Sequence, residues 1–426
     1  MVHGAERDHR NQQQLEPRGA LVRPLGAFER MYYRFSQTST LHFCVVAELA
    51  DDLDPSALDA ALLAVLQRHP LLNVYVGDHP QTRLGFYRPP SVPPIPVTVV
   101  EAAPGRSWRD AVADELTRPF DTSRAPMIRV VLLGSGPNTP AAIVLTVDHV
   151  IVDGMSAGFI LRDLFSALNG HDLAALPVPP SQEELIGALR DGQLAANGQP
   201  VPAQPGWLAT LSTLRPFDGA LPHLSAIAFD ENLTRRLVTR AEHTTVHSAL
   251  VSAMSRVIIE SGRNEFVRML TPCDFRSHIG VDDDVCLYFT MIRTAFTREQ
   301  LAELWDMARI VGDQLTHGRS LPALLAGSAA IEHFIPVDAT TEDTEAFLVG
   351  GLSFETFASN LRVVDMGPPE AVRPVAIWGP AILVQTEGEL NAGICTFNGQ
   401  LRIVCASHDP FPDYLERVRD VLDAAC

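Results

Sequence analysis

The chain has 426 residues, which predicts two domains rather than one core. Hydrophobic residues make up 46% of it and charged residues 20%, a composition typical of a globular protein. The formal net charge of −18 argues against general binding to nucleic acids or anionic membranes, although a small basic patch for a phosphorylated cofactor stays possible.

Targeting and redox signals are sparse. The first twenty residues are polar and charged, unlike a secretory signal. No apolar run approaches the ~20 residues that cross a bilayer. None of the six cysteines forms a CxxC pair, which argues against a zinc cluster. We therefore expect reduced thiols and a cytoplasmic location.

The first half predicts alternating strands and helices. Residues 1–20 show no periodicity and predict a mobile tail. Asp54 followed by Pro55 is typical of a helix start, an N-cap carboxylate before a proline in the first turn. We predict strands over 41–49, 71–76, 126–133 and 142–147, and helices over 54–68, 108–116 and 155–168. This alternation indicates α/β layering.

The second half repeats the alternation after a proline-rich crossover over 176–222. Asn398-Gly399 predicts a hairpin with a type I′ turn over 394–404. Further strands are predicted over 224–229, 266–270 and 286–296, and helices over 231–241, 246–259, 299–315 and 413–424. We therefore divide the chain into the tail, a lobe over 21–175, the crossover, and a lobe over 223–426.

The most informative stretch runs from Asp148 to Gly154, between a buried strand and a helix. His149 can act as a general base at neutral pH, or it can be a structural histidine at a strand end. Asp153 is too close in sequence to need a relay role; we predict that it holds the turn through a buried ion pair with Arg276, the alternative being that Arg276 is a surface guanidinium. Gly154 allows close approach of a cofactor arm or of the helix.

The same stretch offers two other interpretations. Ser156 lies in a G-x-S-x-G pattern, which would be the nucleophile elbow of a serine hydrolase, with Asp365 and His408 in the right chain order. Against this, no oxyanion-type His-Gly-Gly segment occurs upstream. A metal site would need further ligands that the sequence does not offer, so we expect no metal. His69, at a helix C-terminus, is expected to be structural.

Several motifs together resemble one family. Asp148 to Gly154 resembles the HHxxxDG motif of nonribosomal-peptide condensation domains and chloramphenicol-acetyltransferase-like acyltransferases. Asp148 stands in place of the first histidine, and Leu361 stands where a glycine is common. Other stretches agree in order across residues 22–425: Arg68-His69-Pro70, Pro119-Phe120-Asp121, Asp274-Phe275-Arg276, Ser359-Asn360-Leu361 and Thr396-Phe397-Asn398-Gly399. The set looks most similar to the polyketide-associated acyltransferases, the group that contains phthiocerol dimycocerosyl transferase.

The resemblance implies an α/β pseudo-dimer of two chloramphenicol-acetyltransferase-like domains, V-shaped, with His149 in a central tunnel. It implies transfer of an acyl group from acyl-CoA or a phosphopantetheinyl acyl carrier to a hydroxyl of a polyketide or similar metabolite. Donor and acceptor would enter from opposite faces, without an acyl-enzyme, a metal or a permanently bound cofactor. We further expect a monomer and possible cleft contacts from Ser359, Asn360 and Trp378. An amide-forming enzyme and a non-catalytic carrier-binding protein stay open as alternatives.

Overall fold

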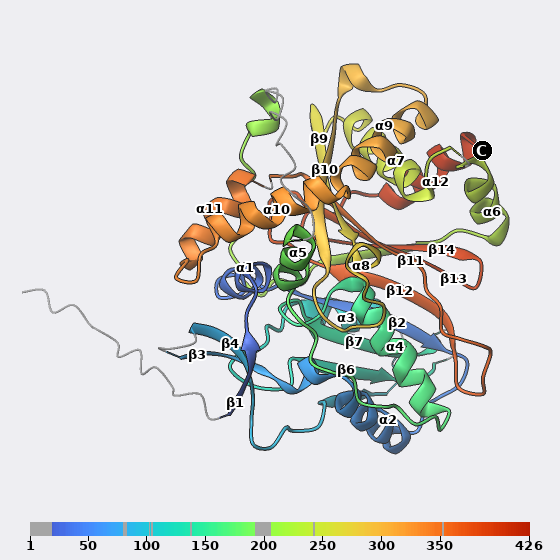
Figure 1. The fold of residues 1–426 in the computed structure, drawn as a ribbon. Helices are drawn as coiled ribbons and strands as arrows, with labels where there is room; N and C mark the ends of the chain where they lie inside the picture. The colour runs from blue at the N-terminus through green and yellow to red at the C-terminus, as the bar shows by residue number, and fades with distance from the viewer. Residues whose placement is uncertain are drawn as a thin grey trace, which may run out of the picture.

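The computed structural model describes residues 19–79, 83–101, 103, 105–136, 139–191, 206–241, 243–351 and 353–426. Within these ranges the chain forms two α/β halves, one below the other in Figure 1. Residues 1–18, which make up most of the predicted tail, lie outside the described part.

The first half is built on a mixed five-stranded sheet. Its strands follow the order β12 (Pro374–Ile382), β2 (His42–Leu49), β7 (Ala141–Asp148), β6 (Ile128–Leu133) and β5 (Val97–Val100). A smaller sheet has the order β1 (Ala20–Pro24), β4 (Arg83–Arg88) and β3 (Tyr75–His79). The helices of this half and of the crossover are α1 (Ala27–Phe35), α2 (Pro55–Arg68), α3 (Trp108–Leu116), α4 (Gly154–Leu168) and α5 (Gln182–Asp191), with 3-10 turns η1 (Pro70–Asn73) and η2 (Gly206–Ala209).

The second half is built on a six-stranded sheet. Its order is β10 (Phe289–Thr297), β9 (Phe266–Asp274), β11 (Thr356–Val363), β13 (Leu390–Phe397), β14 (Gln400–Ser407) and β8 (His223–Ala228). Its helices are α6 (Glu231–Arg240), α7 (Val246–Glu260), α8 (Arg276–Ile279), α9 (Leu304–Gly318), α10 (Leu321–Phe334), α11 (Thr341–Gly351) and α12 (Tyr414–Ala424), with the 3-10 turn η3 (Arg298–Gln300). The predicted hairpin is confirmed, because Asn398 and Gly399 both have the positive φ of a type I′ turn.

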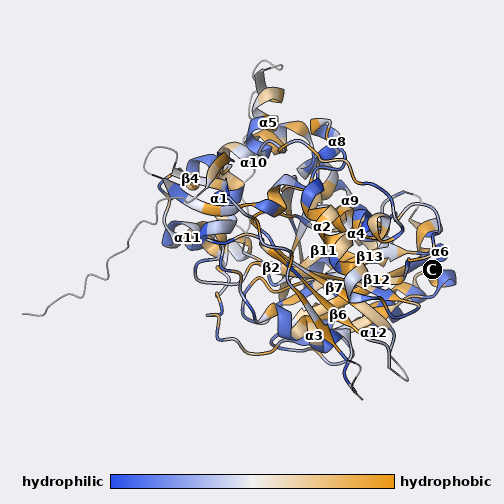
Figure 2. Cartoon of the chain, turned by 90° about the horizontal axis from the view of Figure 1, so that it is seen from below, coloured by the Kyte–Doolittle hydropathy of each residue, from blue (hydrophilic) through white to orange (hydrophobic). Residues whose placement is uncertain are grey.

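Alternation along β2 shows how the first sheet is buried on both faces. Phe43 and Val45 point into the core beneath α2 and α4, whereas Cys44 and Val46 point into a second core that includes Trp108 of α3. Figure 2 shows the apolar strands of this sheet with helices packed around them. The near-continuous apolar sequence of the strand is therefore explained by burial from two sides.

Several regions differ from the predicted elements. Residues 71–76 were expected to be a strand, but η1 occupies its first part and β3 begins at Tyr75. Helices α10 and α11 were not predicted, and they contact α1 at the left of Figure 1. Strand β12 was not predicted either, and it pairs antiparallel with β2 although it lies within the range 223–426.

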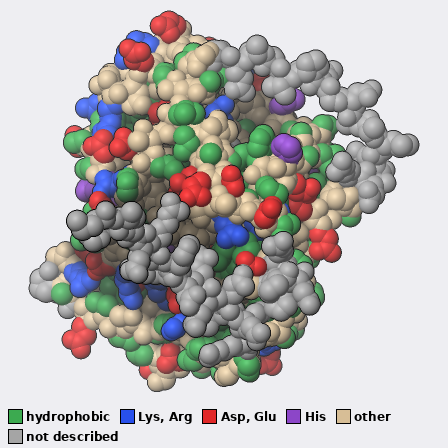
Figure 3. Space-filling view, turned by 90° about the vertical axis from the view of Figure 1, so that its left-hand side faces the viewer, with side chains coloured by type: hydrophobic (Ala, Val, Ile, Leu, Met, Phe, Trp, Pro, Cys, Tyr) green, Lys and Arg blue, Asp and Glu red, His purple; other side chains and the backbone are tan. Residues whose placement is uncertain are grey.

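The molecular surface carries charges of both signs on the face that Figure 3 shows. On the face shown in Figure 3, acidic and basic side chains alternate with apolar ones over the part that is not drawn in grey. None of the helices in the described ranges has the length and apolarity needed to cross a membrane.

Candidate active site

His149 lies in the turn between β7 and α4. Its backbone N–H donates a hydrogen bond to Leu41 O at 2.9 Å, which continues the pairing of β7 with β2 by one residue. The imidazole packs among the rings of Tyr32, Phe43 and Phe289, whose centroids lie 4.6, 5.0 and 5.6 Å from its own. The turn and these three rings therefore fix the position of the imidazole.

Two cavities meet at His149. The larger has a volume of about 370 Å³ and is lined by residues of both halves, among them Gly154 and Ser359. The smaller has a volume of about 60 Å³ and is lined mainly by apolar side chains. His149, Phe357 and Ile382 line both cavities. Although the residue is only 7% exposed, its ring can be reached from two directions.

Burial makes the His149 imidazole a neutral group at physiological pH. Removal from water lowers its pKa to about 4, and the Asp153 carboxylate and nearby backbone carbonyls oppose this shift only in part. Nδ1 is buried and has no hydrogen-bond partner within the described part of the chain. The ring is therefore available as an unprotonated base.

Asp153 organises the turn that follows His149. Its carboxylate accepts a hydrogen bond from the Ser156 N–H at 2.8 Å and so caps the N-terminus of α4. It also accepts from the Tyr288 N–H at 2.9 Å, which ties the turn to the second half of the chain. Burial alone would raise the pKa of Asp153, but Arg276 and these hydrogen bonds outweigh burial and lower it. The carboxylate therefore stays charged.

The predicted ion pair between Asp153 and Arg276 is present. Arg276 Nη1 lies 2.9 Å from Asp153 Oδ2, and both side chains are about 5% exposed or less. Arg276 Nη1 also contacts Asp274 Oδ1 at 2.8 Å, and Nη2 donates to the Cys286 carbonyl at 3.2 Å. The alternative of a surface guanidinium is therefore wrong, and Arg276 joins the two halves behind the turn that carries His149.

Gly154 leaves room at the wall of the larger cavity. A Cβ atom at this position would lie 2.9 Å from Leu361 Cδ2 and 3.8 Å from Ser359 Oγ. Contacts below 3.0 Å require a neighbour to move, and Leu361 is only 4% exposed. The glycine thus permits close packing of the start of α4 against β11.

Ser156 does not have the environment of a nucleophile. Its Oγ donates to the Cys286 carbonyl at 2.8 Å and accepts from Arg276 Nη2 at 2.8 Å. The residue is fully buried and lines neither cavity at His149, and neither Asp365 nor His408 lines them. The G-x-S-x-G interpretation therefore has no support in the geometry, because the hydroxyl is used to pack the two halves together.

Asp148 and His69 both lie away from the cavities that meet at His149. Asp148 Oδ1 accepts from the Val150 N–H at 2.9 Å, and burial raises its pKa to about 7. His69 is buried with Nε2 2.9 Å from Asp163 Oδ2, an ion-pair geometry that agrees with the expected structural role. Asp148 thus shapes the turn without contacting the space in which a substrate would lie.

The three possible cleft residues are placed differently. Ser359 and Asn360, on β11, line the larger cavity. Trp378 lines neither cavity at His149; its Nε1 donates to Glu48 Oε1 at 3.0 Å and its ring packs on Trp108. The expectation for Trp378 is therefore wrong, because the alternation along β12 turns this side chain to the opposite face of the sheet.

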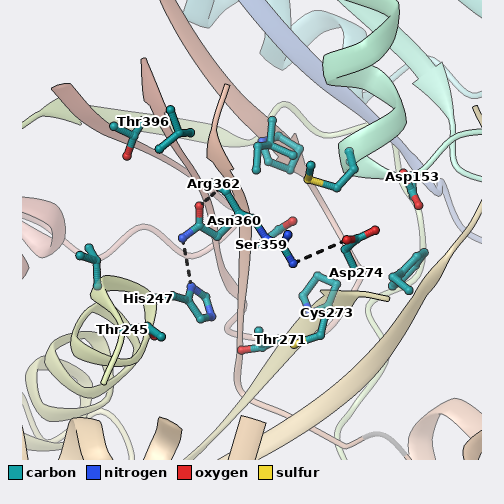
Figure 4. Close-up of a pocket in the computed structure, with 18 of the residues that line it drawn as sticks. Asp153, Thr245, His247, Thr271, Cys273, Asp274, Ser359, Asn360, Arg362 and Thr396 are labelled. Carbon is teal, nitrogen blue, oxygen red and sulfur yellow. Dashed lines mark hydrogen bonds and ion pairs between the residues drawn. The ribbon is translucent and has the colours of Figure 1, made fainter. Parts of the chain in front are cut away.

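Sequence reasoning missed a polar group at the outer part of the larger cavity. His247, Arg319 and Arg362 line it, and Figure 4 shows His247 facing Asn360 and Arg362 reaching towards Asp274. Burial, together with the charges of the two arginines, lowers the pKa of His247 to about 4. Arg362 comes two residues after Asn360, so its placement could have been found from that motif, whereas His247 and Arg319 carry no sequence signal.

No metal-binding cluster of His, Cys, Asp and Glu side chains occurs within the described ranges. The cysteines at positions 44, 273, 286, 395, 405 and 426 are all free.

Part of the chain is similar in sequence to known proteins. No family model matches the chain. It is 29% identical over 232 residues to the phosphinothricin tripeptide synthetase PhsC of Streptomyces viridochromogenes, covering 50% of this chain and 20% of that protein. It is 26% identical over 291 residues to the phosphinothricin tripeptide synthetase PhsB of the same organism, covering 63% of this chain and 24% of that protein. The chain thus spans only about a quarter or less of these two relatives.

Solved structures match over nearly the whole chain. Polyketide synthase associated protein 5 from Mycobacterium tuberculosis has a TM-score of 0.65 at 16% identity, covering 95% of this chain and 98% of that one. The condensation domain of the Monacolin K polyketide synthase MokA has a TM-score of 0.63 at 11% identity, covering 95% and 98%. At such identities the likeness establishes the fold.

The chain thus has the chloramphenicol-acetyltransferase-like fold of two α/β halves that these structures share, and part of its sequence is similar to nonribosomal peptide synthetases.

Proposed function

We propose that this protein is an O-acyltransferase that moves an acyl group from a thioester of CoA or of a carrier protein to a hydroxyl of a polyketide or similar metabolite. One observation carries the proposal: the unprotonated His149 ring lines both cavities at the place where they meet. A thioester and a hydroxyl that both reach this ring would lie next to the imidazole.

The proposed reaction uses His149 as a general base. Because Nδ1 is buried and has no partner within the described residues, we assign Nε2 as the nitrogen that takes the hydroxyl proton while the oxygen attacks the thioester carbon. When the tetrahedral intermediate collapses, the C–S bond breaks and the imidazolium returns the proton to the thiolate. Asp153 does not relay the proton, since Arg276 and two backbone N–H groups occupy its carboxylate. It lowers the cost of the transient imidazolium by its charge.

An amine acceptor is the second candidate. The relatives include peptide synthetases, and the same base could take a proton from an amine. Paired hydroxyl and amine analogues of one acceptor, offered with the same donor, separate the two reactions by the mass of the product.

His149→Ala tests the proposed chemistry. We expect transfer from a panel of acyl-CoAs and acylated carrier proteins to fall by roughly 10²–10⁴-fold, the usual contribution of a general base. His171→Ala, which changes a histidine with a 57% exposed side chain, is the control and should keep full activity. Product would be followed by intact mass, and near-wild-type rates in His149→Ala would reject the mechanism.

The pH profile gives an independent readout. Because the pKa of His149 is lowered to about 4, the base form is already complete at about pH 6, and kcat/KM should stay level from about pH 8 to about pH 5. It should decline only below about pH 5, whereas an ordinary histidine would lose activity near about pH 6.5.

We further propose that the chain divides into lobes over 21–175 and 223–426, joined by a crossover over 176–222. We also propose that the protein is a monomer in the cytoplasm, and that its donor is either CoA-bound or carrier-bound. Tight binding of a carrier protein without turnover of any donor would favour the non-catalytic alternative.

A further inference from the structure

The smaller cavity at His149 has a distinctive lining. Its walls come from α1, α11, strands β9, β10 and β11, the end of β12 and the crossover, and they include Phe35, Leu214 and Leu348. Apart from the imidazole, most of its polar groups are already paired; Ser212 Oγ, for example, donates to Phe354 O at 2.9 Å. Thr386 Oγ1 is an exception, since it has no hydrogen-bond partner within the described ranges. The space therefore favours an apolar occupant.

A segment of the crossover closes this cavity. We call residues 208–215 the strap. At one end Arg268 Nη1 donates to Leu208 O at 3.1 Å, and in the middle the Ser212 N–H donates to Ser353 Oγ at 3.1 Å. At the other end the Arg215 N–H donates to Gln385 O at 2.9 Å. The strap is thus held by residues of β9, of the segment after α11 and of the segment after β12, and it forms one wall of the cavity.

The two cavities differ in chemistry as well as in size. The larger carries Arg319, Arg362 and His247 along its wall, whereas the described residues that line the smaller include no arginine or acidic side chain. A thioester has the same division, with an apolar acyl tail on one side of the carbonyl and a polar pantetheine arm with a phosphate on the other. Only one orientation of the thioester places its carbonyl carbon at His149 with the acyl tail in the smaller cavity and the pantetheine arm in the larger one.

We propose that the smaller cavity is the acyl-chain pocket of this enzyme, and that Leu214 of the strap and Leu348 of α11 limit the length of the chain. This inference rests on the proposed acyl transfer. The cavity measures about 60 Å³, on a scale where one water needs about 10–15 Å³, so it accepts about four to six methylene-sized groups. The preferred donor is therefore a short, unbranched or lightly branched aliphatic thioester, with its pantetheine arm in the larger cavity.

The expected energetics make the limit measurable. Each methylene moved from water into apolar surroundings should tighten binding about fourfold until the pocket is full. Chains beyond the limit must displace packed side chains, so affinity should stop rising and then fall.

The test uses acyl-N-acetylcysteamine thioesters of even chain length from two to twelve carbons. Binding is measured calorimetrically in the His149→Ala background, where turnover is removed, and kcat/KM is measured in the otherwise wild-type protein. Leu214→Ala and Leu348→Ala should move the optimum to longer chains by about two carbons and raise the ratio of eight-carbon to four-carbon kcat/KM about tenfold. Leu214→Phe should move the optimum to shorter chains.

Leu211→Ala is the matched control, because Leu211 lies in the same strap, is 63% exposed and does not line the cavity. Its chain-length profile should equal that of the wild type. Unchanged profiles in all three pocket variants, with melting temperatures showing that they are folded, would overturn the inference even if His149-dependent transfer occurs. A shifted binding profile without any transfer would instead reject the proposed function and keep the pocket. No binding of any chain length would overturn the pocket itself.

Discussion

At the residue scale, the role of each side chain in the turn after β7 depends on which surfaces it contacts. His149 and Ser156 are both buried and lie in the same short stretch of sequence, yet only the imidazole borders open space. The Ser156 hydroxyl is saturated by Arg276 and Cys286. The reactivity proposed for His149 follows from unfilled hydrogen-bonding capacity beside a cavity, and the residue types alone do not reveal it.

Asp148→Asn should increase stability at alkaline pH. The pKa of Asp148 is raised by burial from 3.8 to about 7, so the stability that comes from its protonated state is fully present below pH 3.8 and is lost as the pH rises through about 7. An asparagine keeps an oxygen for the Val150 N–H without a buried charge. We expect a gain of roughly 1–2 kcal/mol in the free energy of unfolding at about pH 8, and a smaller gain at about pH 5.

Denaturant titrations at the two pH values measure this difference, with exposed Asp59→Asn as the control. Transfer activity should persist in Asp148→Asn, because Asp148 borders neither cavity at His149. A pH-independent effect on stability would contradict the buried-charge explanation.

Removing one partner of the Asp153–Arg276 pair should be strongly destabilising. Asp153→Ala leaves the buried guanidinium with less compensation and removes the cap of α4, and we expect a loss of roughly 3–5 kcal/mol. The exposed pair Arg106–Asp114, with side chains 44% and 47% exposed, is the matched control, and Asp114→Ala should cost less than about 1 kcal/mol. Equal stability of Asp153→Ala and the wild type in urea would disprove the assigned role.

At the element scale, the strand–turn–helix unit of β7 and α4 is specified by local signals. The apolar run of β7 is buried throughout, and Asp153 caps the helix that begins at Gly154. The local pattern does not specify which segment packs on this turn. That segment is β11, which lies about 200 residues later in the sequence, at residues 356–363. The need for glycine at position 154 therefore comes from the contact of the turn with Leu361 of β11, a residue far away in the sequence.

Two glycines of α4 should respond in opposite ways to alanine. Gly154→Ala places a methyl group 2.9 Å from Leu361 Cδ2 at the wall of the larger cavity, so it should lower stability by roughly 1–3 kcal/mol and reduce activity. Gly158 has no atom within 4 Å of such a methyl, so Gly158→Ala should stabilise the helix by about 0.5–1 kcal/mol. Thermal unfolding of both variants checks the sign, and stabilisation by both would show that the wall is loosely packed.

At the scale of the whole molecule, the two halves are interlocked rather than merely adjacent. β12 follows most of the second half in sequence, yet it completes the first sheet by pairing with β2. It also packs against β13 of the other sheet, where Gly393 approaches Pro380. This crossing holds the walls of both cavities at His149, because Ile382 at the end of β12 borders each of them.

Gly393→Ala should disrupt this crossing. Its Cβ would lie 1.8 Å from the Pro380 carbonyl oxygen, and two backbones would have to separate, so we expect a loss of roughly 3 kcal/mol or more. Gly327→Ala in α10, with no atom within 4 Å of the added methyl, is the control and should be neutral or mildly stabilising. Soluble, cooperative unfolding of Gly393→Ala at the wild-type midpoint would contradict the close packing of the two sheets.

Elements with strong local signals could be predicted from the residues alone. Helices α2 and α3, the hairpin of β13 and β14, and the turn from His149 to Gly154 could all be predicted, because capping residues, apolar periodicity and Asn-Gly act over a few positions. The Asp153–Arg276 pair was predicted from motifs in order rather than from spacing.

Which residues border the cavities depends on how distant segments pack together. The placement of Trp378 on the far face, the arrival of His247 and Arg319 in the larger cavity, and the closure of the smaller one by the strap depend on contacts between segments far apart in the sequence. β12 illustrates the reason: its partner strand β2 lies near the other end of the chain, and no local pattern encodes which sheet a strand will join.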